Sequence, residues 1–492
     1  MNNISINEYL QKLGYKPPGG ETYAYIQEWL EWYQGDVEKF HKYKVFNGTT
    51  TKEERRYQLG MAKKVSEDWA NLVLNEKVSI KAGSYEKRLN EILEQNNFRV
   101  RGNQLIELAY ALGTGALVEY LSDEQIVIDF IRADMIRPLS WDNGDITECA
   151  FGSYRVIDGR ECIYLQIHRK GRAEDGEKES NYYIENHYVE VESGMDFESS
   201  EDILPVVDTG SEFPLFQIIT PNICNNIDLD SPMGISVFAN AIDQLKGCDL
   251  VYDSYTNEYV LGKKRILVPV SLAKMQMQKD GVTAPAFDPD DDIYYLMPAD
   301  RQEDNKPIEV DMKIRAQEHE LGIQRALDLC SFKCGLGTGR YQFNSTGVKT
   351  ATEVISDKSD LYQNLKKNEI PVRTAVIGMV RAVAFLDGQS DVEATVDFDD
   401  SIIEDSNATI DRNIKLTQAG LRSKVTAIME INKCSEPEAQ AELKRIAEDN
   451  QITAQDVDWT GGDDDESKQD AGEQKKDDQG EEEKADDHKS DS

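Results

Sequence analysis

The first part of the chain changes from a helical to a strand-like pattern of apolar residues. Helical spacing holds in four stretches, at residues 26–40, 62–72, 89–93 and 105–112. After Ala116 apolar and polar residues alternate, and turn signals separate strands expected at 117–121, 126–131, 150–157, 162–168 and 182–191. This order predicts an antiparallel meander beside a helical layer, which is an α+β fold.

The middle of the chain predicts two long helices with a small β module between them. Residues 234–262 keep a three-and-four spacing of apolar positions, which as a helix would be about 40 Å long. Strands are expected at 265–273 and 292–297, with Asp/Pro-rich turns around them. The second helix is expected over 312–334, with Ile323, Leu327, Cys330 and Cys334 on one stripe.

A glycine-rich segment at 335–339 and a polar loop to Gly347 then lead into a third long helical stretch, 350–386. Pro371 lies inside it and lacks an amide donor, so a kink or an interruption is expected near Glu369. Residues 391–398 alternate as a strand. Short helices follow, and Ser435 with Glu438 forms a capping-box pattern. Beyond Gly461 no apolar periodicity remains, so an unstructured tail is expected.

Charge is the unusual bulk property: 92 acidic and 55 basic residues give a formal net charge of −37. The tail 463–492 holds 14 acids and 5 bases, which leaves −28 on the rest. The one run of three bases, residues 263–265, is too short for an extended phosphate-binding patch. The composition therefore disfavours tight DNA binding over a large surface, although an acidic wall would let DNA slide past.

Seven scattered cysteines, an odd number without short paired spacings, suit reduced thiols better than a disulfide framework. No apolar run approaches the roughly 20 residues that span a bilayer, and the first 20 residues lack the pattern of a secretory signal. We therefore expect an assembly protein that works inside a cell, without a membrane segment.

No residues assemble into a recognisable catalytic or cofactor site. The segments 335–340 and 113–115 lack the Gly-Lys-Ser/Thr ending of a P-loop, and we interpret their glycines as turn residues. Asp288, Asp290, Asp291 and Asp292 do not fit a calcium-loop register, so a solvated acidic turn is preferred to a cation site. His168, His187 and His319 are expected in surface or half-buried structural roles, and Cys330 and Cys334 as core residues. We predict no catalytic residue, no metal and no cofactor.

The most interesting polar residues lie in the loop after the second long helix and on the third. Arg340, Gln342, Asn344 and Lys349 would meet phosphates if that loop faced a channel, and Lys358, Lys366 and Lys367 would add weak contacts. The alternative is an ordinary polar surface loop.

Several segments, in their order along the chain, resemble the portal proteins of long-tailed phages of Gram-positive bacteria. They are residues 69–76 (WANLVLNE), 112–116 (LGTGA), 138–144 (PLSWDNG), 349–354 (KTATEV) and 398–403 (FDDSII). The resemblance covers about residues 20–450. It implies a portal-like α+β fold with an α/β wing, long stem helices, a small β-containing clip, a kinked channel helix and a helical crown.

Carried onto this sequence, the resemblance divides the chain into regions. They are an N-terminal arm (1–24), wing (25–230), stem helix (231–262), clip (263–311), second stem helix (312–334), tunnel loop (335–349), kinked channel helix (350–386), wing strand (387–403), crown (404–460) and acidic tail (461–492). The family implies a structural, non-enzymatic ring, expected to be a dodecamer, at the capsid vertex of the virion.

The implied partners are terminase, head-completion or connector proteins, capsid and scaffolding proteins, and double-stranded DNA that passes without sequence specificity. Assembly is expected in the host cytoplasm. Two other readings stay open: an acidic capsid scaffolding or adaptor protein without a channel, and a metal-dependent nuclease that uses the Asp288–Asp292 cluster.

Overall fold

The computed structural model describes most of the chain, in separate ranges. The chain divides into two compact units, Met1–Asp405 and Ser406–Ser492. The described ranges are 4–46, 50–122, 124–157, 159–191, 193, 204–269, 275–277, 283–285, 294–297, 306–343, 351–389, 392–398, 406–432 and 434–455. Within these ranges no helix is both long enough and apolar enough to cross a membrane.

The helical layer of the first unit forms where the apolar spacing predicts it. Its helices are α1 (Ile4–Lys12), α2 (Gly20–Gln34), α3 (Glu38–His41), α4 (Met61–Val73), α5 (Glu86–Gln95) and α6 (Phe98–Leu112). Gly35 ends α2 because its φ of 74° is a left-handed conformation that glycine adopts without strain. The buried faces of these helices, including Trp29, Trp69 and Leu105, join one hydrophobic core.

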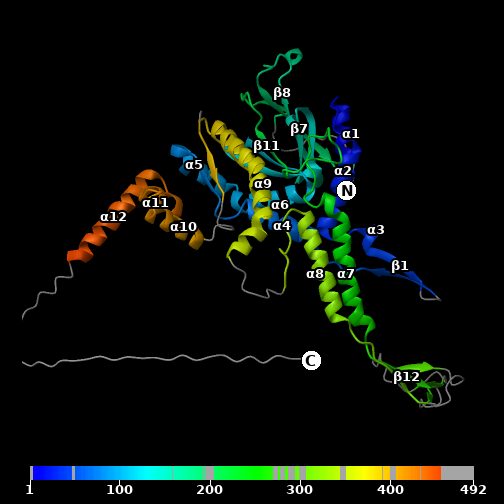
Figure 1. Ribbon diagram of the computed structural model, residues 1–492. Helices are drawn as coiled ribbons and strands as arrows, with labels where there is room; N and C mark the ends of the chain where they lie inside the picture. The colour runs from blue at the N-terminus through cyan, green and yellow to red at the C-terminus, as the bar shows by residue number, and fades with distance from the viewer. Residues whose placement is uncertain are drawn as a thin grey trace, which may run out of the picture. The chain divides into compact units, whose positions relative to one another are not determined.

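Two antiparallel sheets lie beside this layer (Figure 1). The larger is a meander in the order β10-β9-β8-β7-β6, made by Val206–Asp208, Tyr182–Glu190, Arg160–Lys170, Asp145–Ile157 and Ile136–Asp142. The smaller has the order β11-β4-β5, made by Phe216–Ile219, Gly115–Ser122 and Gln125–Arg132. The predicted meander is confirmed for β7, β8 and β9. It is wrong for β4 and β5, because the later strand β11 pairs with β4 and completes a separate sheet.

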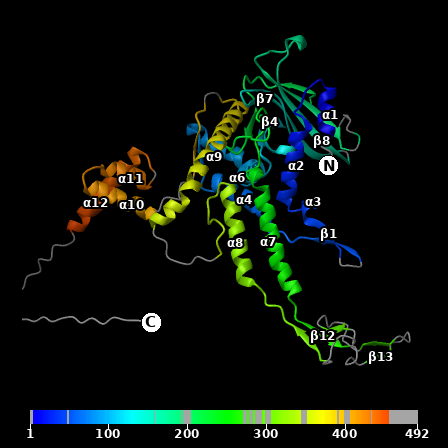
Figure 2. The ribbon, with the colours of Figure 1, turned by 45° about the vertical axis from the view of Figure 1, so that its right-hand side comes forward.

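The two long helices of the middle region are α7 (Ile242–Leu261) and α8 (Ala316–Lys333), which run side by side (Figures 1 and 2). The prediction that the first begins near Gly234 is wrong by about two turns. A Cβ on Gly234 would lie 2.3 Å from the carbonyl oxygen of Gly113, so the two backbones touch there. Ile235 and Phe238 are buried in this irregular segment, which explains why their spacing resembled a helix.

The predicted β module connects α7 to α8. Its central strand β12 (Arg265–Pro269) pairs with β15 (Tyr294–Met297) in parallel and with β16 (Ile308–Val310) antiparallel. A hairpin of β13 (Met275–Met277) and β14 (Thr283–Pro285) belongs to the same region. Two further strand pairs occur elsewhere in the unit: β1 (Lys42–Phe46) with β2 (Thr51–Arg55), and β3 (Ser79–Lys81) with β17 (Thr395–Asp397).

The third long helix, α9 (Ala351–Leu386), packs on the smaller sheet through buried residues such as Val372, Val376 and Met379. It continues through Pro371, so the expected interruption near Glu369 does not occur. The predicted strand at 391–398 is present in part as β17.

The second unit contains α10 (Ser406–Gln418), α11 (Lys424–Asn432) and α12 (Glu436–Gln455). The predicted capping box is confirmed, because the Ser435 amide donates to Glu438 Oε2 at 2.9 Å. Glu430 of α11 pairs with both Arg412 and Arg422, which ties these helices together. The acidic tail 461–492 lies outside the described residues.

Candidate functional site

The glycine segment after α8 is a turn built on left-handed backbone. Gly335, Gly337 and Gly339 have φ values of 79°, 77° and 78°, which favour glycine. The amides of Gly335 and Leu336 donate back to α8 carbonyls at 3.1 and 3.0 Å, which caps the helix. Leu336 is buried in the main core. The interpretation of these residues as turn glycines is confirmed.

Side chains from three helices fix this turn by donating to its carbonyl oxygens. The donors are Trp69 to Cys334 (3.0 Å), Asn364 to Gly335 (2.9 Å), Ser331 to Gly337 (2.7 Å) and Gln324 to Tyr341 (3.0 Å). Residues 334–341 are therefore a base attached to α4, α8 and α9, and none of these four bonds reaches a described residue of the loop after Tyr341.

Arg340 lies at this base and is directed to α4. Its guanidinium is 3.6 Å from the carboxylate of Asp68, which also accepts a 2.7 Å hydrogen bond from Lys64. Burial raises the pKa of the neighbouring Tyr341 hydroxyl, and the Asp68 charge raises it further. The Arg340 side chain keeps 34% exposure. Its charge is thus partly neutralised, and one side remains open to a ligand.

The remaining predicted residues of this loop are not brought together with Arg340 in the described structure. Gln342 is exposed beside Gly339, and Phe343 is also exposed. Asn344 and Lys349 lie outside the described residues, as does the side chain of Lys358 in α9.

The two predicted lysines of α9 differ in their surroundings. Lys366 lies 3.1 Å from the buried carboxylate of Glu369, which Arg373 approaches from the next turn at 3.8 Å. Lys367 is exposed, and no ion pair joins it to a described acidic residue. Lys366 is therefore largely neutralised by its own helix, and Lys367 is the more available cation of the two.

Pro371 is accommodated by a side chain from outside the helix. A residue with an amide at this position would donate to the Lys367 carbonyl, and proline cannot. Instead Asn222 Nδ2 donates to the Lys367 oxygen at 2.7 Å. The Asn222 amide donates in turn to Asn368 Oδ1 at 2.9 Å. The first of these bonds gives the Lys367 carbonyl a donor in place of the missing helical one, and α9 continues through Pro371.

The pairing of α7 with α8 is fixed by charge at one end. Glu258 accepts from Arg315 at 2.8 Å and lies 3.3 Å from His319. The hydrogen bond from Arg315 lowers the pKa of Glu258 to about 2. His319 is half-buried, as expected. Because Glu258 lies in the last turn of α7 and Arg315 directly precedes α8, this cluster fixes the antiparallel register of the two helices.

At the other end, the contact between α7 and α8 is apolar. Cys330 and Cys334 are buried, which confirms their predicted core role, and Cys330 contacts Cys248 of α7. This thiol–thiol contact, together with burial, raises the pKa of Cys248. All the cysteines are free thiols.

Two histidines illustrate how burial changes an expected role. His187 is half-buried, and its Nδ1 lies 2.8 Å from the hydroxyl of Tyr9. The expectation of a surface or half-buried place is wrong for His168, which is fully buried between Phe151 and Phe216. Burial lowers the pKa of His168 to about 3, so it is neutral.

Sequence reasoning missed a buried polar cluster that joins α7 to the segment before α4. The Val37 amide donates to His41 Nδ1 at 3.0 Å, so His41 Nε2 carries the proton and donates to Asp249 at 3.1 Å. Asp249 also accepts from the Leu59 amide at 2.7 Å. The sequence did contain a sign of this cluster, because Asp249 lies beside the apolar positions Leu245 and Cys248.

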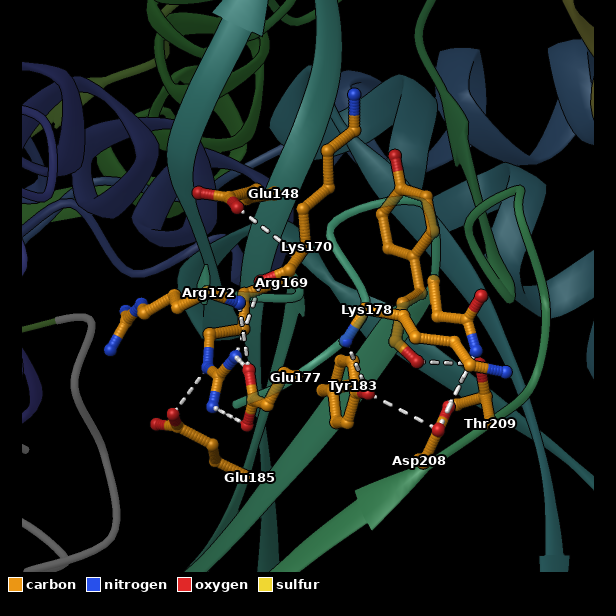
Figure 3. Close-up of polar contacts among 12 residues, drawn as sticks. Glu148, Arg169, Lys170, Arg172, Glu177, Lys178, Tyr183, Glu185, Asp208 and Thr209 are labelled. Atoms are coloured by element: carbon orange, nitrogen blue, oxygen red, sulfur yellow. Dashed lines mark hydrogen bonds and ion pairs between the residues drawn. The ribbon is translucent and has the colours of Figure 1, made fainter. Parts of the chain in front are cut away.

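A second missed cluster surrounds Arg169, shown in Figure 3. This buried guanidinium makes paired hydrogen bonds to Glu177 at 2.5 and 2.9 Å and also pairs with Glu185. Burial alone would raise the pKa of Glu185, but hydrogen bonds from His187, Arg169 and Tyr15 outweigh it and lower the pKa to about 2. The cluster fixes the β8–β9 turn and holds the segment after α1 through Tyr15.

The third missed residue is Glu119 in β4, whose carboxylate oxygens are buried without a hydrogen-bond partner among the described residues. Burial raises its pKa from 4.5 to about 8. No sequence signal distinguishes it from a solvent-facing residue in an alternating strand.

No group of three or more His, Cys, Asp or Glu side chains in the described ranges could hold a metal ion. The cluster Asp288–Asp292 lies outside those ranges.

Comparison with known proteins gives one extensive match. The family model for phage portal proteins, SPP1 Gp6-like, matches residues 19–456. No curated protein sequence matches the chain. In solved structures, the chain is similar to one in the virion of a native gene transfer agent (GTA) particle, at 11% identity and a TM-score of 0.33. It is also similar to one in the neck of the native GTA particle computed with C12 symmetry, at 12% identity and a TM-score of 0.35. Each match covers 75% of this chain and 88% of the other. So low a similarity identifies neither a partner nor a ring size.

Proposed function

Because the chain belongs to the SPP1 Gp6-like family of phage portal proteins, we propose that it forms a ring at the capsid vertex through which double-stranded DNA enters and leaves. The match over residues 19–456 is the observation that carries this proposal. A structural portal or connector role follows from the family. The ring, expected to hold twelve copies, its channel and its place in the virion belong to the proposal.

The order of elements supports the proposed regions. The antiparallel pair α7 and α8 would be the stem, and the β module of 263–311 that connects them would be the clip. The two sheets and their helical layer would form the wing, together with the N-terminal arm, since α1 packs into the same core. Helices α10 to α12 would form the crown.

The charges of the candidate site suit a channel that guides DNA without gripping it. Arg340 and Lys366 each lie beside a buried carboxylate of their own subunit, Asp68 and Glu369. Such paired cations offer phosphates weaker contacts than free ones. The chain as a whole carries −37. A DNA duplex would therefore meet few strong attachment points as it moves.

The segment 335–349 is proposed as the tunnel loop. Its base, residues 334–341, is fixed by the hydrogen bonds described above, so movement during DNA passage would belong to the residues beyond Tyr341. Deleting residues 338–347 should block DNA packaging while purified rings stay intact by electron microscopy. Normal packaging by that variant would refute the assignment of the loop.

The proposed partners follow from the place of a portal in assembly. They are terminase during packaging, head-completion or connector proteins afterwards, and capsid and scaffolding proteins at the vertex, with assembly in the host cytoplasm. ATP hydrolysis would belong to terminase, and we assign this chain no catalytic residue and no cofactor.

Negative-stain electron microscopy of the purified full-length protein tests the proposal. Rings with a central hole, with twelvefold symmetry in class averages, are expected. Monomers or filaments would instead favour the rival function of an acidic scaffolding or adaptor protein. DNA cleavage in the presence of magnesium would favour a nuclease that uses the Asp288–Asp292 cluster.

A further inference from the structure

The β1–β2 hairpin extends from the first unit with almost all of its side chains exposed. Every residue of β2 is exposed, and in β1 only Tyr43 is half-buried. Phe46, the last residue of β1, is 68% exposed, and its neighbour Val45 is also exposed. A two-stranded hairpin has little stability alone in water, and an exposed phenylalanine at its end contributes nothing to it.

The base of the hairpin is nevertheless rigid. The Arg56 amide donates to the His41 carbonyl at 2.8 Å, and the Arg56 guanidinium lies 4.5 Å from the centre of the Tyr43 ring. The hydrogen bond from His41 to Asp249 ties this base to α7. The hairpin is therefore held in one direction beside α7, as a preformed binding element would be.

The outer face of α8 is apolar although it is exposed. Leu321, Leu329 and Phe332 are 60%, 60% and 58% exposed, and spacings of eight and three residues place them on one side of the helix. The opposite side carries the buried Leu327 and Cys330. A helix that is apolar on two sides is normally covered on both. Figures 1 and 2 show that α8 and the hairpin lie on opposite sides of α7.

We infer that the β1–β2 hairpin of one subunit packs on the exposed apolar face of α8 in the neighbouring copy, with Phe46 as its main contact. This inference rests on the proposed ring. A closed ring needs two different, complementary faces on each subunit, and these two features lie on opposite sides of α7.

Charge favours a second copy of this chain as the occupant. Residues 42–56 contain five basic and two acidic residues, a net charge of +3, so the rest of the chain carries −40. A neighbouring copy therefore carries a net negative charge outside its own hairpin, and this charge attracts the basic hairpin. DNA suits the hairpin less well, because Lys44 and Arg55 already pair with Glu53 and Asp36 at 3.6 and 3.2 Å. The exposed side chains of Val45 and Phe46 also have no group that could bind a phosphate.

A photo-crosslinking amino acid at position 46 of the full-length protein tests the contact directly. After irradiation of purified rings, we expect a covalent dimer whose crosslinked peptide, identified by mass spectrometry, contains residues of α8. A crosslink to a different surface, to added duplex DNA, or none between subunits of intact rings would overturn the inference. Absence of rings in the unmodified protein would instead refute the proposed function.

Substitutions give an independent measurement. Phe46→Asp and Leu329→Asp should each raise the protein concentration needed for half-assembly by roughly tenfold or more, since each loses about the burial of one large apolar side chain. Phe46→Leu, which keeps an apolar side chain, is the matched control and should assemble nearly as the wild type does. Both positions are exposed in the subunit, so its thermal unfolding should not change. Unaltered assembly of Phe46→Asp would overturn the inference.

Discussion

At the scale of single residues, Glu119 shows how costly a buried carboxyl group can be. Its two oxygens have no partner among the described residues, and burial holds its pKa near 8 rather than 4.5. Between these two values the folded state keeps a proton that the unfolded state releases. The contribution of Glu119 to stability is therefore fully present below pH 4.5 and is lost, by about 1.4 kcal/mol per pH unit, as the pH rises to about 8.

Glu119→Gln should remove this dependence of stability on pH. The variant should match the wild type to within about 1 kcal/mol near pH 5 and exceed its free energy of unfolding by a few kcal/mol near pH 8.5. Chemical denaturation of both proteins across this range measures the difference. A constant difference between the two proteins at all pH values would show that Glu119 does not titrate with folding.

Asn222 supplies the donor that Pro371 lacks, and a double-mutant cycle tests this role. Asn222→Ala should lower the free energy of unfolding by about 1 kcal/mol, because the Lys367 carbonyl loses its partner. In a Pro371→Ala background the restored amide can donate to that carbonyl, so the same substitution should cost less. Equal costs in the two backgrounds, measured by denaturation, would refute the compensation.

At the scale of elements, the sequence predicted those whose periodicity is regular and local. The strands β7, β8 and β9 and the helices α8 and α9 were found because alternation or helical spacing continues over their length. The start of α7 was misplaced because Ile235 and Phe238 are buried at a helical interval in an irregular segment. The backbone of that segment touches Gly113, which is far away in the sequence. The periodicity of apolar residues carries no information about such a long-range contact.

The contact of Gly113 with Gly234 explains why the irregular segment requires glycine. Gly234→Ala places a methyl group 2.3 Å from the Gly113 oxygen and 2.9 Å from Thr220 Cβ. We expect a loss of more than about 2 kcal/mol of stability. Gly247→Ala in α7 is the matched control, because its Cβ meets nothing within 4 Å. It should be neutral or stabilise by up to about 1 kcal/mol. Similar midpoints for both variants in thermal unfolding would contradict this explanation.

The sequence named candidate channel residues but not the electrostatics around them. Arg340 and Lys366 stay predictions as channel cations, and their partners Asp68 and Glu369 were not identified. Asp68 comes from a distant helix, so only the fold brings it to Arg340. Glu369 follows Lys366 by three residues, a spacing that the sequence displays and that predicts such a pair.

At the scale of the whole molecule, the charge of −37 determines how a ring would treat DNA. A protein that neutralises Z phosphates shows a slope of about −0.9Z when log affinity is plotted against log salt. Two of the candidate channel cations, Arg340 and Lys366, are already paired with carboxylates of their own subunit. We therefore expect very few contacts with phosphates. Binding of a short duplex to purified rings should therefore be weaker than the roughly 10⁻⁴ M limit of ordinary non-specific binding.

Fluorescence anisotropy with a labelled duplex between about 50 and 200 mM salt measures both the affinity and its dependence on salt. We expect a slope near zero, and we expect Lys366→Ala to leave it unchanged, since Lys366 is neutralised by Glu369. A steep slope would correspond to about four or more phosphate contacts, roughly one for each cation of a subunit. It would mean that the channel binds its DNA tightly. In that case the acidity of the chain would have to lie on surfaces away from the path of the DNA, and passage would require active release at every step.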